Sequence, residues 1–270
     1  MFEEKAGFLG AGNMGAPILT ACVERDIFAP GSVFVFDPDK SKTEPLRDTF
    51  GINVCSSAEE LAESCGVLVL CVKPQAFGSA LPPLADIVRR NGTFVISIAA
   101  GKTTGTVSGL LGGVPVGRLF PNLNAKIGEA ATAYCVGHGA DEHQKDLTAA
   151  IAGALGLAVD YPEELFPVFG VLGGCAPAYT FMFIDSLAKA AEKAGMDPET
   201  ALSVACRTVS GSAMLLASSG EAPETLIGRV CSKGGTTIEG VRSLEADGLG
   251  AVVEKAFNAS LARDKALSGN

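Results

Sequence analysis

Short apolar runs alternate with stretches of helical pattern in the N-terminal part of the chain, and this alternation limits the fold more than any other feature. The runs are rich in Val, Ile and Phe and cover residues 6–10, 32–37, 66–72, 92–100 and 114–120. The helical stretches between them cover residues 15–25, 58–65, 75–90 and 103–111. Strands that alternate with helices form a doubly wound parallel sheet with helices on both faces. We therefore expect an α/β domain, with further strands at 131–137 and 157–161 and a helix at 142–154.

The pattern changes at Pro162, after which clusters of β-branched residues become rare. Residues 163–218 read as long Ala-rich helices, and a last helix is expected at 249–267. A run of helices after an alternating α/β region is typical of a separate all-α domain. The two expected domains are 1–162, with the parallel sheet, and 163–270, with helices only.

A glycine-rich turn opens the α/β region: the expected strand 6–10 runs into Gly10-Ala11-Gly12-Asn13-Met14-Gly15. Gly10 permits the tight turn from strand to helix, Gly12 lets a pyrophosphate approach the backbone, and Gly15 allows close packing of the helix on the strand. The N-terminus of the following helix supplies N–H groups and a positive dipole end to phosphates. We therefore predict a Rossmann dinucleotide-binding domain with Gly10, Gly12, Asn13, Met14 and Gly15 at the cofactor.

Asp37 closes the second expected strand, at the place where an acidic residue bonds the hydroxyls of the adenosine ribose. A carboxylate there repels a 2′-phosphate and so favours NADH, and Lys40 and Lys42 partly offset this charge. The alternative is that Asp37-Pro38-Asp39 is only a turn with an Asx contact. The cofactor prediction is NAD(P)H.

The net charge of −9 and the pI near 4.8 argue against non-specific binding to nucleic acid or to an anionic membrane. No run reaches about 18 uninterrupted apolar residues, and the chain opens with acidic residues where a signal peptide carries bases. We therefore expect a cytoplasmic protein that acts on a small molecule, without nucleic-acid or membrane partners. The high mean hydropathy, +0.31, indicates a buried subunit interface.

Metal binding is not expected. The eight cysteines form no Cys-x-x-Cys pair, and the two histidines, His138 and His143, are five residues apart. Zinc sites instead bring their ligands in close pairs. The cysteines are expected to be reduced and to pack as small apolar residues.

Several motifs together resemble the Δ1-pyrroline-5-carboxylate reductase family over nearly the whole chain. In order, they are FLGAGNMG (8–15), VKPQ (72–75), SIAAG (97–101), Arg118 with Pro121-Asn122, APAY (176–179) and SKGGTTIEG (232–240). The resemblance implies a Rossmann domain followed by an all-α dimerisation domain, and reduction of 1-pyrroline-5-carboxylate to L-proline by NAD(P)H. It also implies a homodimer whose copies can assemble into a larger ring.

The chain departs from the family pattern in three segments near the implied site. Gly173-Gly174-Cys175-Ala176-Pro177 stands where the family has Ser-Gly-Ser-Gly-Pro, and Leu119-Phe120-Pro121-Asn122-Leu123-Asn124 stands where it has Val-Met-Pro-Asn-Thr-Pro. Lys233 replaces the proline of the Ser-Pro-Gly-Gly-Thr-Thr signature. These changes bear on the substrate more than on the fold.

By resemblance, the segment 232–237 holds the substrate: Thr237 reaches the ring nitrogen as the catalytic hydroxyl, and the carboxylate is bound by Ser232, Gly234, Gly235 and Thr236. Two glycines before a helix expose backbone N–H groups, which suits a carboxylate. The alternative for Thr236 and Glu239 is a capping box, in which Thr236 caps the helix.

Three further segments are expected at the nicotinamide half of the cofactor. Val72, Lys73 and Pro74 end one strand, and the small residues Ala99, Ala100 and Gly101 end the next, where a ligand lies in the crevice beyond the strands. The alternative for these small residues is close packing of helix on strand. Asn122 offers an amide to the nicotinamide or its ribose, and Arg118 is either part of this rim or a salt-bridge partner within the fold.

Three other functions remain open from the sequence, and the first is an imine dehydrogenase of the same two-domain plan with a different imine substrate. A β-hydroxyacid dehydrogenase of the same plan needs a base, typically a lysine on the helix that crosses between the domains. That helix here carries lysines only at 189 and 193, which favours an imine substrate. The third alternative is a nucleotide-binding homologue without catalysis.

Overall fold

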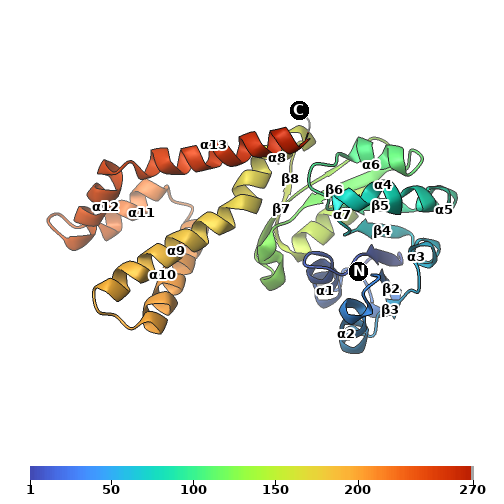
Figure 1. The fold of residues 1–270 in the computed structure, drawn as a ribbon, viewed down its shortest axis with the longest axis horizontal. Coiled ribbons are helices and arrows are strands. Elements are labelled where there is room, and N and C mark those ends of the chain that lie inside the picture. Colours follow the sequence, from blue (N-terminus) through green and yellow to red (C-terminus); the bar gives the residue numbers. More distant parts are fainter. Residues whose placement is uncertain (269–270) are drawn as a thin grey trace. The chain divides into compact units, whose positions relative to one another are not determined.

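The computed structural model describes residues 1–268 and divides into two compact units (Figure 1). The first unit contains residues 1–174 together with the end of the chain from Arg263, and the second contains residues 175–262. The expected domain boundary at 162/163 stays a prediction.

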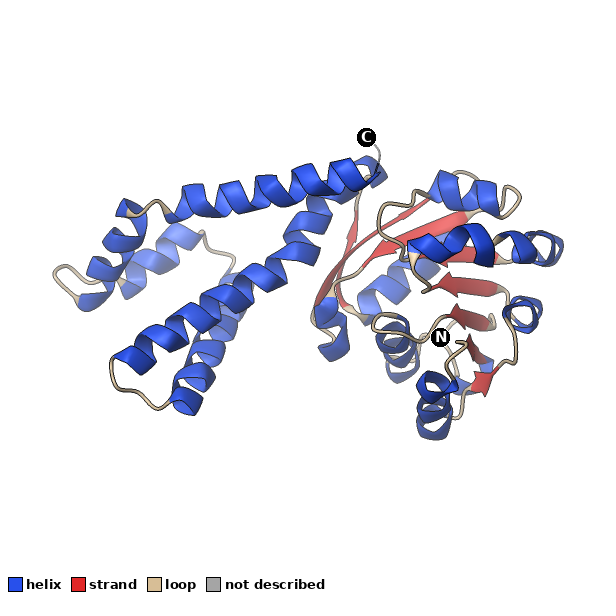
Figure 2. Cartoon of the chain, in the orientation of Figure 1, coloured by secondary structure: helices blue, strands red, loops and turns tan. Residues whose placement is uncertain are grey.

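A single eight-stranded sheet organises the first unit among the described residues (Figure 2). The strand order is β3-β2-β1-β4-β5-β6-β7-β8, and every neighbouring pair is parallel except β6 and β7. The order reverses between β1 and β4, which is where doubly wound sheets bind nucleotides. The expected fold class is confirmed. The strands are β1 Ala6–Leu9, β2 Val33–Phe36, β3 Asn53–Val54, β4 Val67–Leu70, β5 Phe94–Ser97, β6 Val116–Phe120, β7 Ala130–Val136 and β8 Gly156–Asp160.

Helices cover both faces of this sheet (Figure 2). Neighbouring residues of one strand point to opposite faces, so Phe8 and Leu9 belong to different apolar clusters. The cluster around Phe8 includes α1 and α7, and the cluster around Leu9 includes α3, α5 and α6. The helices of this unit are α1 Gly15–Glu24, η1 Pro30–Ser32, α2 Lys40–Phe50, α3 Ala58–Ser64, η2 Pro74–Ala76, α4 Phe77–Ala80, η3 Pro82–Leu84, α5 Ala85–Asn91, α6 Thr104–Leu110, η4 Leu123–Ile127, α7 Glu142–Ala154, η5 Glu163–Leu165 and α8 Phe166–Phe169.

The structure differs from the sequence expectations locally, and it contains two elements that the sequence did not predict, α2 and β3. The helix expected over 75–90 is broken into η2, α4, η3 and α5, because Pro82 and Pro83 cannot continue a helix. The strand β7 runs antiparallel to β6, since only the short segment η4 connects them and a parallel pair needs a longer crossover. A π-helical turn, η6 Gly170–Cys175, precedes the helix that begins at Ala176.

The second unit consists of helices, as expected. Ala188, Ala201 and Ala205 are buried where α9 packs on α10, and the Tyr179 hydroxyl lies 2.5 Å from Oγ of Ser260 on α13. The helices are α9 Ala176–Lys193, α10 Pro198–Ser219, α11 Pro223–Val230, α12 Thr236–Ala246 and α13 Leu249–Ser268.

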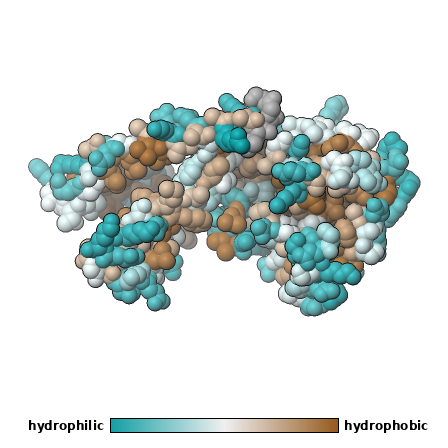
Figure 3. Space-filling model, in the orientation of Figure 1, coloured by the Kyte–Doolittle hydropathy of each residue, from teal (hydrophilic) through white to brown (hydrophobic). Residues whose placement is uncertain are grey.

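Large apolar side chains are exposed on the second unit (Figure 3). Met182 and Met214 are each 70% exposed, and Val252 is 62% exposed. The segments 163–193 and 198–219 also have the length and mean hydropathy of a membrane span, by length and composition only. Such a surface needs a cover that the isolated chain does not supply.

Candidate active site

The glycine-rich turn connects β1 to α1 at the point where the strand order reverses. Gly10 has φ +104°, a conformation that favours glycine. A Cβ on Gly15 would lie 2.1 Å from the carbonyl oxygen of Gly10, so the start of α1 needs glycine to approach the strand end. Both residues are therefore explained by the fold of the turn itself.

Gly12 differs from these two glycines. A Cβ there would meet no atom of the described chain within 4 Å, so packing does not require glycine at this position. In addition, α1 is capped by no side chain within residues 1–268. The open backbone at Gly12 and the uncapped helix end are what a pyrophosphate needs. The residues of this turn, with Asn13 exposed and Met14 half-buried, therefore fit a dinucleotide.

Asp37 follows β2 and fastens the glycine-rich turn to it. Its Oδ2 accepts a hydrogen bond from the Ala11 N–H at 2.9 Å, and its Oδ1 accepts one from the Asp39 N–H at 3.0 Å. The second bond is the Asx contact that the sequence left open. A carboxylate has about four acceptor positions, so these bonds leave capacity for ribose hydroxyls.

Lys42 lies against the same carboxylate. Its Nζ is 3.3 Å from Oδ1 of Asp37 and 3.5 Å from Oδ2 of Asp39. The hydrogen bond and charge of Asp37 raise the pKa of Lys42. Lys42, in the first turn of α2, therefore partly neutralises the charge of Asp37, as the sequence suggested.

In the strand order, β4 is the direct neighbour of β1, which leads into the glycine-rich turn, and β5 follows β4. A Cβ on Gly10 would lie 3.1 Å from the carbonyl carbon of Cys71 and 3.3 Å from Cγ1 of Val72, so the turn touches the end of β4 directly. Lys73 is exposed and extended before η2, which begins at Pro74. These positions agree with the crevice expected at this edge of the sheet, but the roles of the three residues stay predictions.

After β5 the chain makes a turn at Ala99–Gly101. Ala99 is buried and its N–H donates to Oγ of Ser97, whereas Ala100 and Gly101 are exposed. Gly101 has φ +70°, which accounts for glycine at this position. Exposure leaves Ala100 and Gly101 accessible to a ligand.

Asn122 is 8% exposed and both ends of its side chain are used within the fold. Its Nδ2 donates to the carbonyl oxygen of Gly173 at 2.9 Å, and its Oδ1 accepts from the Asn124 N–H at 3.1 Å. The expected contact of this amide with the cofactor stays untested. Both polar atoms of this side chain therefore make hydrogen bonds within the first unit.

Arg118 is a buried salt-bridge partner, one of the two alternatives from the sequence. Its Nη1 lies 2.9 Å from Oε1 of Glu163, and its guanidinium lies 4.7 Å from the ring centroid of Phe166. The two oxygens of Glu163 also accept hydrogen bonds from the N–H and the hydroxyl of Thr104, each at 2.8 Å.

Sequence reasoning did not identify Glu163 and Thr104. An arginine in a buried strand signals a buried anionic partner. That signal does not name the partner, which is 45 residues away in the chain.

The segment 232–237 forms a tight turn before α12. The Gly235 N–H donates to the carbonyl oxygen of Ser232 at 3.0 Å, and Gly234 has φ +73°. Thr236 and Thr237 are exposed and occupy the first turn of α12.

The alternative from the sequence, a capping box at this helix, is wrong. Gly235, not Thr236, is the N-cap residue, and no side chain of the described residues caps α12. Glu239 instead lies 2.9 Å from Nη1 of Arg242. The first-turn N–H groups of α12 are therefore without a side-chain cap, as a carboxylate site requires.

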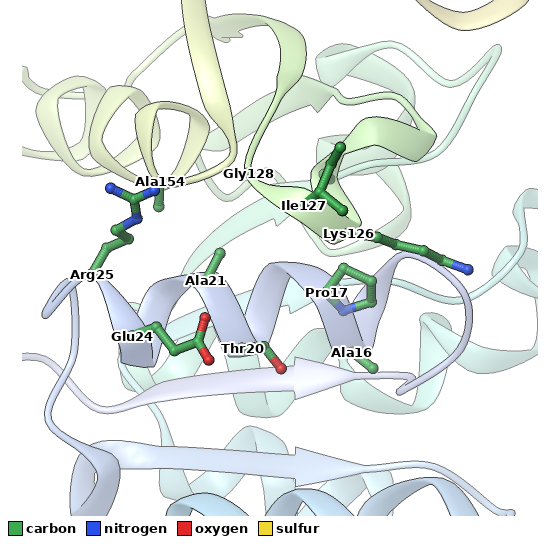
Figure 4. Close-up of a pocket in the computed structure, with 11 residues that line it drawn as sticks. Ala16, Pro17, Thr20, Ala21, Glu24, Arg25, Lys126, Ile127, Gly128 and Ala154 are labelled. Atoms are coloured by element: carbon green, nitrogen blue, oxygen red, sulfur yellow. The ribbon is translucent and has the colours of Figure 1, made fainter. Parts of the chain in front are cut away.

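Two of the cavities in the first unit lie beside the sheet and its helices. One, of about 480 Å³, is a groove between α1 and η4, and none of the predicted site residues lines it (Figure 4). The other, of about 520 Å³, is lined by Gly101 and Arg118 together with Phe120, Glu163 and Phe166. Neither cavity is lined by the glycine-rich turn, which lies where doubly wound sheets bind nucleotides.

The described residues contain no group of three His, Cys, Asp or Glu side chains arranged to bind a metal ion. All eight cysteines are unpaired. Burial raises the pKa of Cys65 and that of Cys71 to about 12, so both are protonated, unreactive thiols at neutral pH.

Comparison with known proteins extends over almost the whole chain. Residues 163–267 match the family model for pyrroline-5-carboxylate reductase dimerisation, and residues 5–101 match the model "NADP oxidoreductase coenzyme F420-dependent". The pyrroline-5-carboxylate reductase of Escherichia coli K12 is 35% identical over 268 residues, which cover 98% of this chain and 99% of the relative.

Solved structures agree with this result. A pyrroline-5-carboxylate reductase from Coxiella burnetii superposes with a TM-score of 0.93 at 29% identity, covering 98% of this chain and 99% of that one. A pyrroline carboxylate reductase from Plasmodium falciparum with NADP bound superposes with a TM-score of 0.87 at 28% identity, covering 99% of both chains. The chain belongs to the pyrroline-5-carboxylate reductase family.

Proposed function

We propose that this chain catalyses the NAD(P)H-dependent reduction of 1-pyrroline-5-carboxylate to L-proline. The observation that carries the proposal is the pair of uncapped helix N-termini: one follows the open Gly12, and the other follows Gly234-Gly235 in the family's signature segment. Each suits one of the two anionic groups that the reaction brings together, a pyrophosphate and a carboxylate.

The first unit binds the cofactor in this proposal. Gly10, Gly12, Asn13, Met14 and Gly15 form the pyrophosphate turn, and Asp37 meets the adenosine ribose. Residues 72–74, 99–101 and Asn122 border the nicotinamide half. When bound, NAD(P)H supplies the hydride that the imine carbon accepts.

The second unit binds the substrate. Ser232, Gly234, Gly235 and Thr236 surround its carboxylate, and the exposed Lys233 adds a positive charge beside them. Thr237 places its hydroxyl at the ring nitrogen. Reduction adds one hydride to the imine carbon and one proton to the nitrogen, so a protonated imine needs no strong acid from the protein. A hydroxyl that hydrogen-bonds the nitrogen is sufficient to orient the ring.

The oligomer follows from the exposed apolar surface of the second unit. The dimerisation-model match at 163–267 supports a homodimer formed by this surface. We extend the proposal to assembly of dimers into a larger ring, as the family resemblance implies. A cytoplasmic location stays a prediction.

The test is the initial rate of cofactor oxidation with pyrroline-5-carboxylate and each of NADH and NADPH. We expect turnover with the imine, and none when 3-hydroxy acids are offered with the oxidised cofactors. An enzyme that binds NAD(P)H but does not oxidise it in the presence of pyrroline-5-carboxylate contradicts the proposal. Turnover of a hydroxy acid would identify the β-hydroxyacid alternative.

A further inference from the structure

Three alternate residues at the end of β6 point to one face and contact one segment of the chain. Arg118, Phe120 and Asn122 are spaced by two, and Asn122 continues the extended backbone beyond the strand, with φ −119° and ψ 177°. We call these three residues the β6 row. Each of them contacts residues between 163 and 174.

Phe120, the middle residue of the β6 row, packs directly on the backbone of the π-turn η6. A Cβ on Gly170 would lie 2.8 Å from Cζ of Phe120, and one on Gly174 would lie 3.5 Å from Cε1. Phe166 meets the same ring edge-on, with centroids 6.2 Å apart. The aromatic ring therefore fits because the π-turn carries glycine at position 170. Phe120 departs from the family pattern, and it contacts the π-turn at Gly170 and at Gly174.

Asn122, the last residue of the β6 row, bonds the same turn through the carbonyl oxygen of Gly173. At the change from the π-turn to α9, the α-helical partner of this carbonyl would be the N–H of residue 177. Residue 177 is proline and has no N–H to donate. The side-chain amide of Asn122, 92% buried, supplies a donor to this carbonyl.

We propose that Asn122 is a positioning residue of the reductase, which replaces the backbone donor that Pro177 lacks and thereby fixes the β6 row against the π-turn. This proposal rests on the proposed function, because the segments that Asn122 positions are those of the proposed reductase site. Asn122 stands at the carboxyl edge of the sheet, where the nicotinamide half of the cofactor is expected. Arg118, at the other end of the row, holds Glu163 and through it the start of α6, directly after the Ala99–Gly101 turn. The row therefore joins two segments of the expected nicotinamide rim.

The test is a double-mutant cycle with Asn122→Ser and Pro177→Ala. Serine is too short to reach Gly173 but keeps an oxygen for the Asn124 N–H, so the change removes the donor and preserves the local turn. Alanine at 177 returns a backbone N–H to the helix. The four proteins are compared by kcat with pyrroline-5-carboxylate, by Kd for NAD(P)H from cofactor fluorescence, and by Tm.

For the positioning role we expect Asn122→Ser to lower kcat about tenfold and to leave Kd for NAD(P)H within about twofold, because the glycine-rich turn supplies most of the cofactor contacts. The double variant should recover kcat to within about twofold of Pro177→Ala alone, since the carbonyl has a donor again. The Tm should recover in the same way.

Other outcomes overturn the proposal. If Asn122 bonds the cofactor directly, Pro177→Ala cannot restore the lost contact. The kcat of the double variant then equals the value expected from adding the effects of the two single variants, and the Kd for NAD(P)H rises. If its role is merely structural, Tm falls and kcat is unchanged. Should the wild type fail to reduce pyrroline-5-carboxylate, the proposed function is wrong, whereas the Tm cycle still measures whether residues 122 and 177 are coupled.

Discussion

The backbone N–H of Ala11 donates to Oδ2 of Asp37 across 2.9 Å, so the residue expected to read the cofactor's ribose also holds the glycine-rich turn in place. A substitution at this position therefore has two effects, on charge and on the shape of the turn. Asparagine separates them, because its amide oxygen can still accept from Ala11 while the negative charge is gone.

We predict that Asp37→Asn shifts the enzyme from NADH toward NADPH. The wild type should use NADH at least as well as NADPH, because a carboxylate repels the 2′-phosphate. The variant should raise the ratio of kcat/KM for NADPH over NADH by about tenfold, or ~1.4 kcal/mol. Asp39→Asn is the control, since Asp39 is an exposed carboxylate that is paired with the same lysine, Lys42. A strong wild-type preference for NADPH that Asp37→Asn leaves unchanged would contradict this assignment.

Thr237→Ala should lower kcat/KM for pyrroline-5-carboxylate about ten- to a hundredfold, because losing a hydrogen bond to a charged partner costs roughly 1.5–3 kcal/mol. Part of the loss should appear in kcat, since the charge on the ring nitrogen changes as hydride arrives. The Kd for NAD(P)H should stay near the wild-type value.

Thr236→Ala is the matched control for this experiment. Neither threonine caps α12, whose N-cap is Gly235, so both variants should keep the Tm of the wild type. Thr236→Ala should also lose less activity. Full activity of Thr237→Ala would show that the segment 232–237 has been assigned the wrong role.

Sedimentation velocity at micromolar concentration should find a dimer, because the apolar side chains of the second unit need a partner surface. Met182→Lys places a charge on that surface, where Met182 is 70% exposed, and should yield monomers with low activity. Ile127→Lys is the control, since Ile127 is 76% exposed on the first unit and its change should leave the dimer intact. A stable and active wild-type monomer would refute the dimer.

The pair of His143 and Glu4 should make stability depend on pH. The hydrogen bond and charge of Glu4 raise the pKa of His143 above 6.5, and although burial raises the pKa of Glu4, its hydrogen bonds with His143 and the backbone outweigh this and lower it below 4.5. A raised histidine pKa stabilises the fold below pH 6.5 and loses this effect as pH rises through the raised value. A lowered carboxyl pKa stabilises above pH 4.5 and loses the effect as pH falls through the lowered value.

The contribution of the pair is therefore greatest between about pH 4.5 and 6.5. The Tm of His143→Gln should fall below that of the wild type in this window, and the difference should diminish toward pH 8. His138→Gln, which changes the other histidine, should show no such window. A Tm difference that is constant from pH 5 to 8 would mean that the ion pair is not its source.

The sequence predicted the elements that carry a strong local pattern. The runs at β1, β4 and β5 are buried on both faces, and such strands are continuous apolar runs that can be recognised from composition. The strand β3 has only two residues, too few for a periodic pattern. The helix α2 contains Pro45 and many charges, which concealed it.

The parts of the site that the sequence did not predict are contacts between residues distant in sequence. Glu163 and Arg118, or Asn122 and Gly173, meet only because β6 lies beside the segment that leads into α9, and no local spacing encodes that pairing. The capping box predicted at Thr236 and Glu239 was wrong for another reason. Its motif was present, but Gly234 and Gly235 allowed the chain to enter α12 one residue earlier than the motif assumes.

The alternation of the β6 row also determines where this chain can gain or lose a residue. Between α6 and β6 the chain passes through Gly112 and Gly113, both with positive φ, and an added residue in such a turn leaves the register of the strand unchanged. Inside β6 the same addition would rotate every later side chain to the opposite face of the sheet. Arg118, Phe120 and Asn122 would then lose their partners together, so length variation among relatives of this chain should occur in the turn and be absent from the strand.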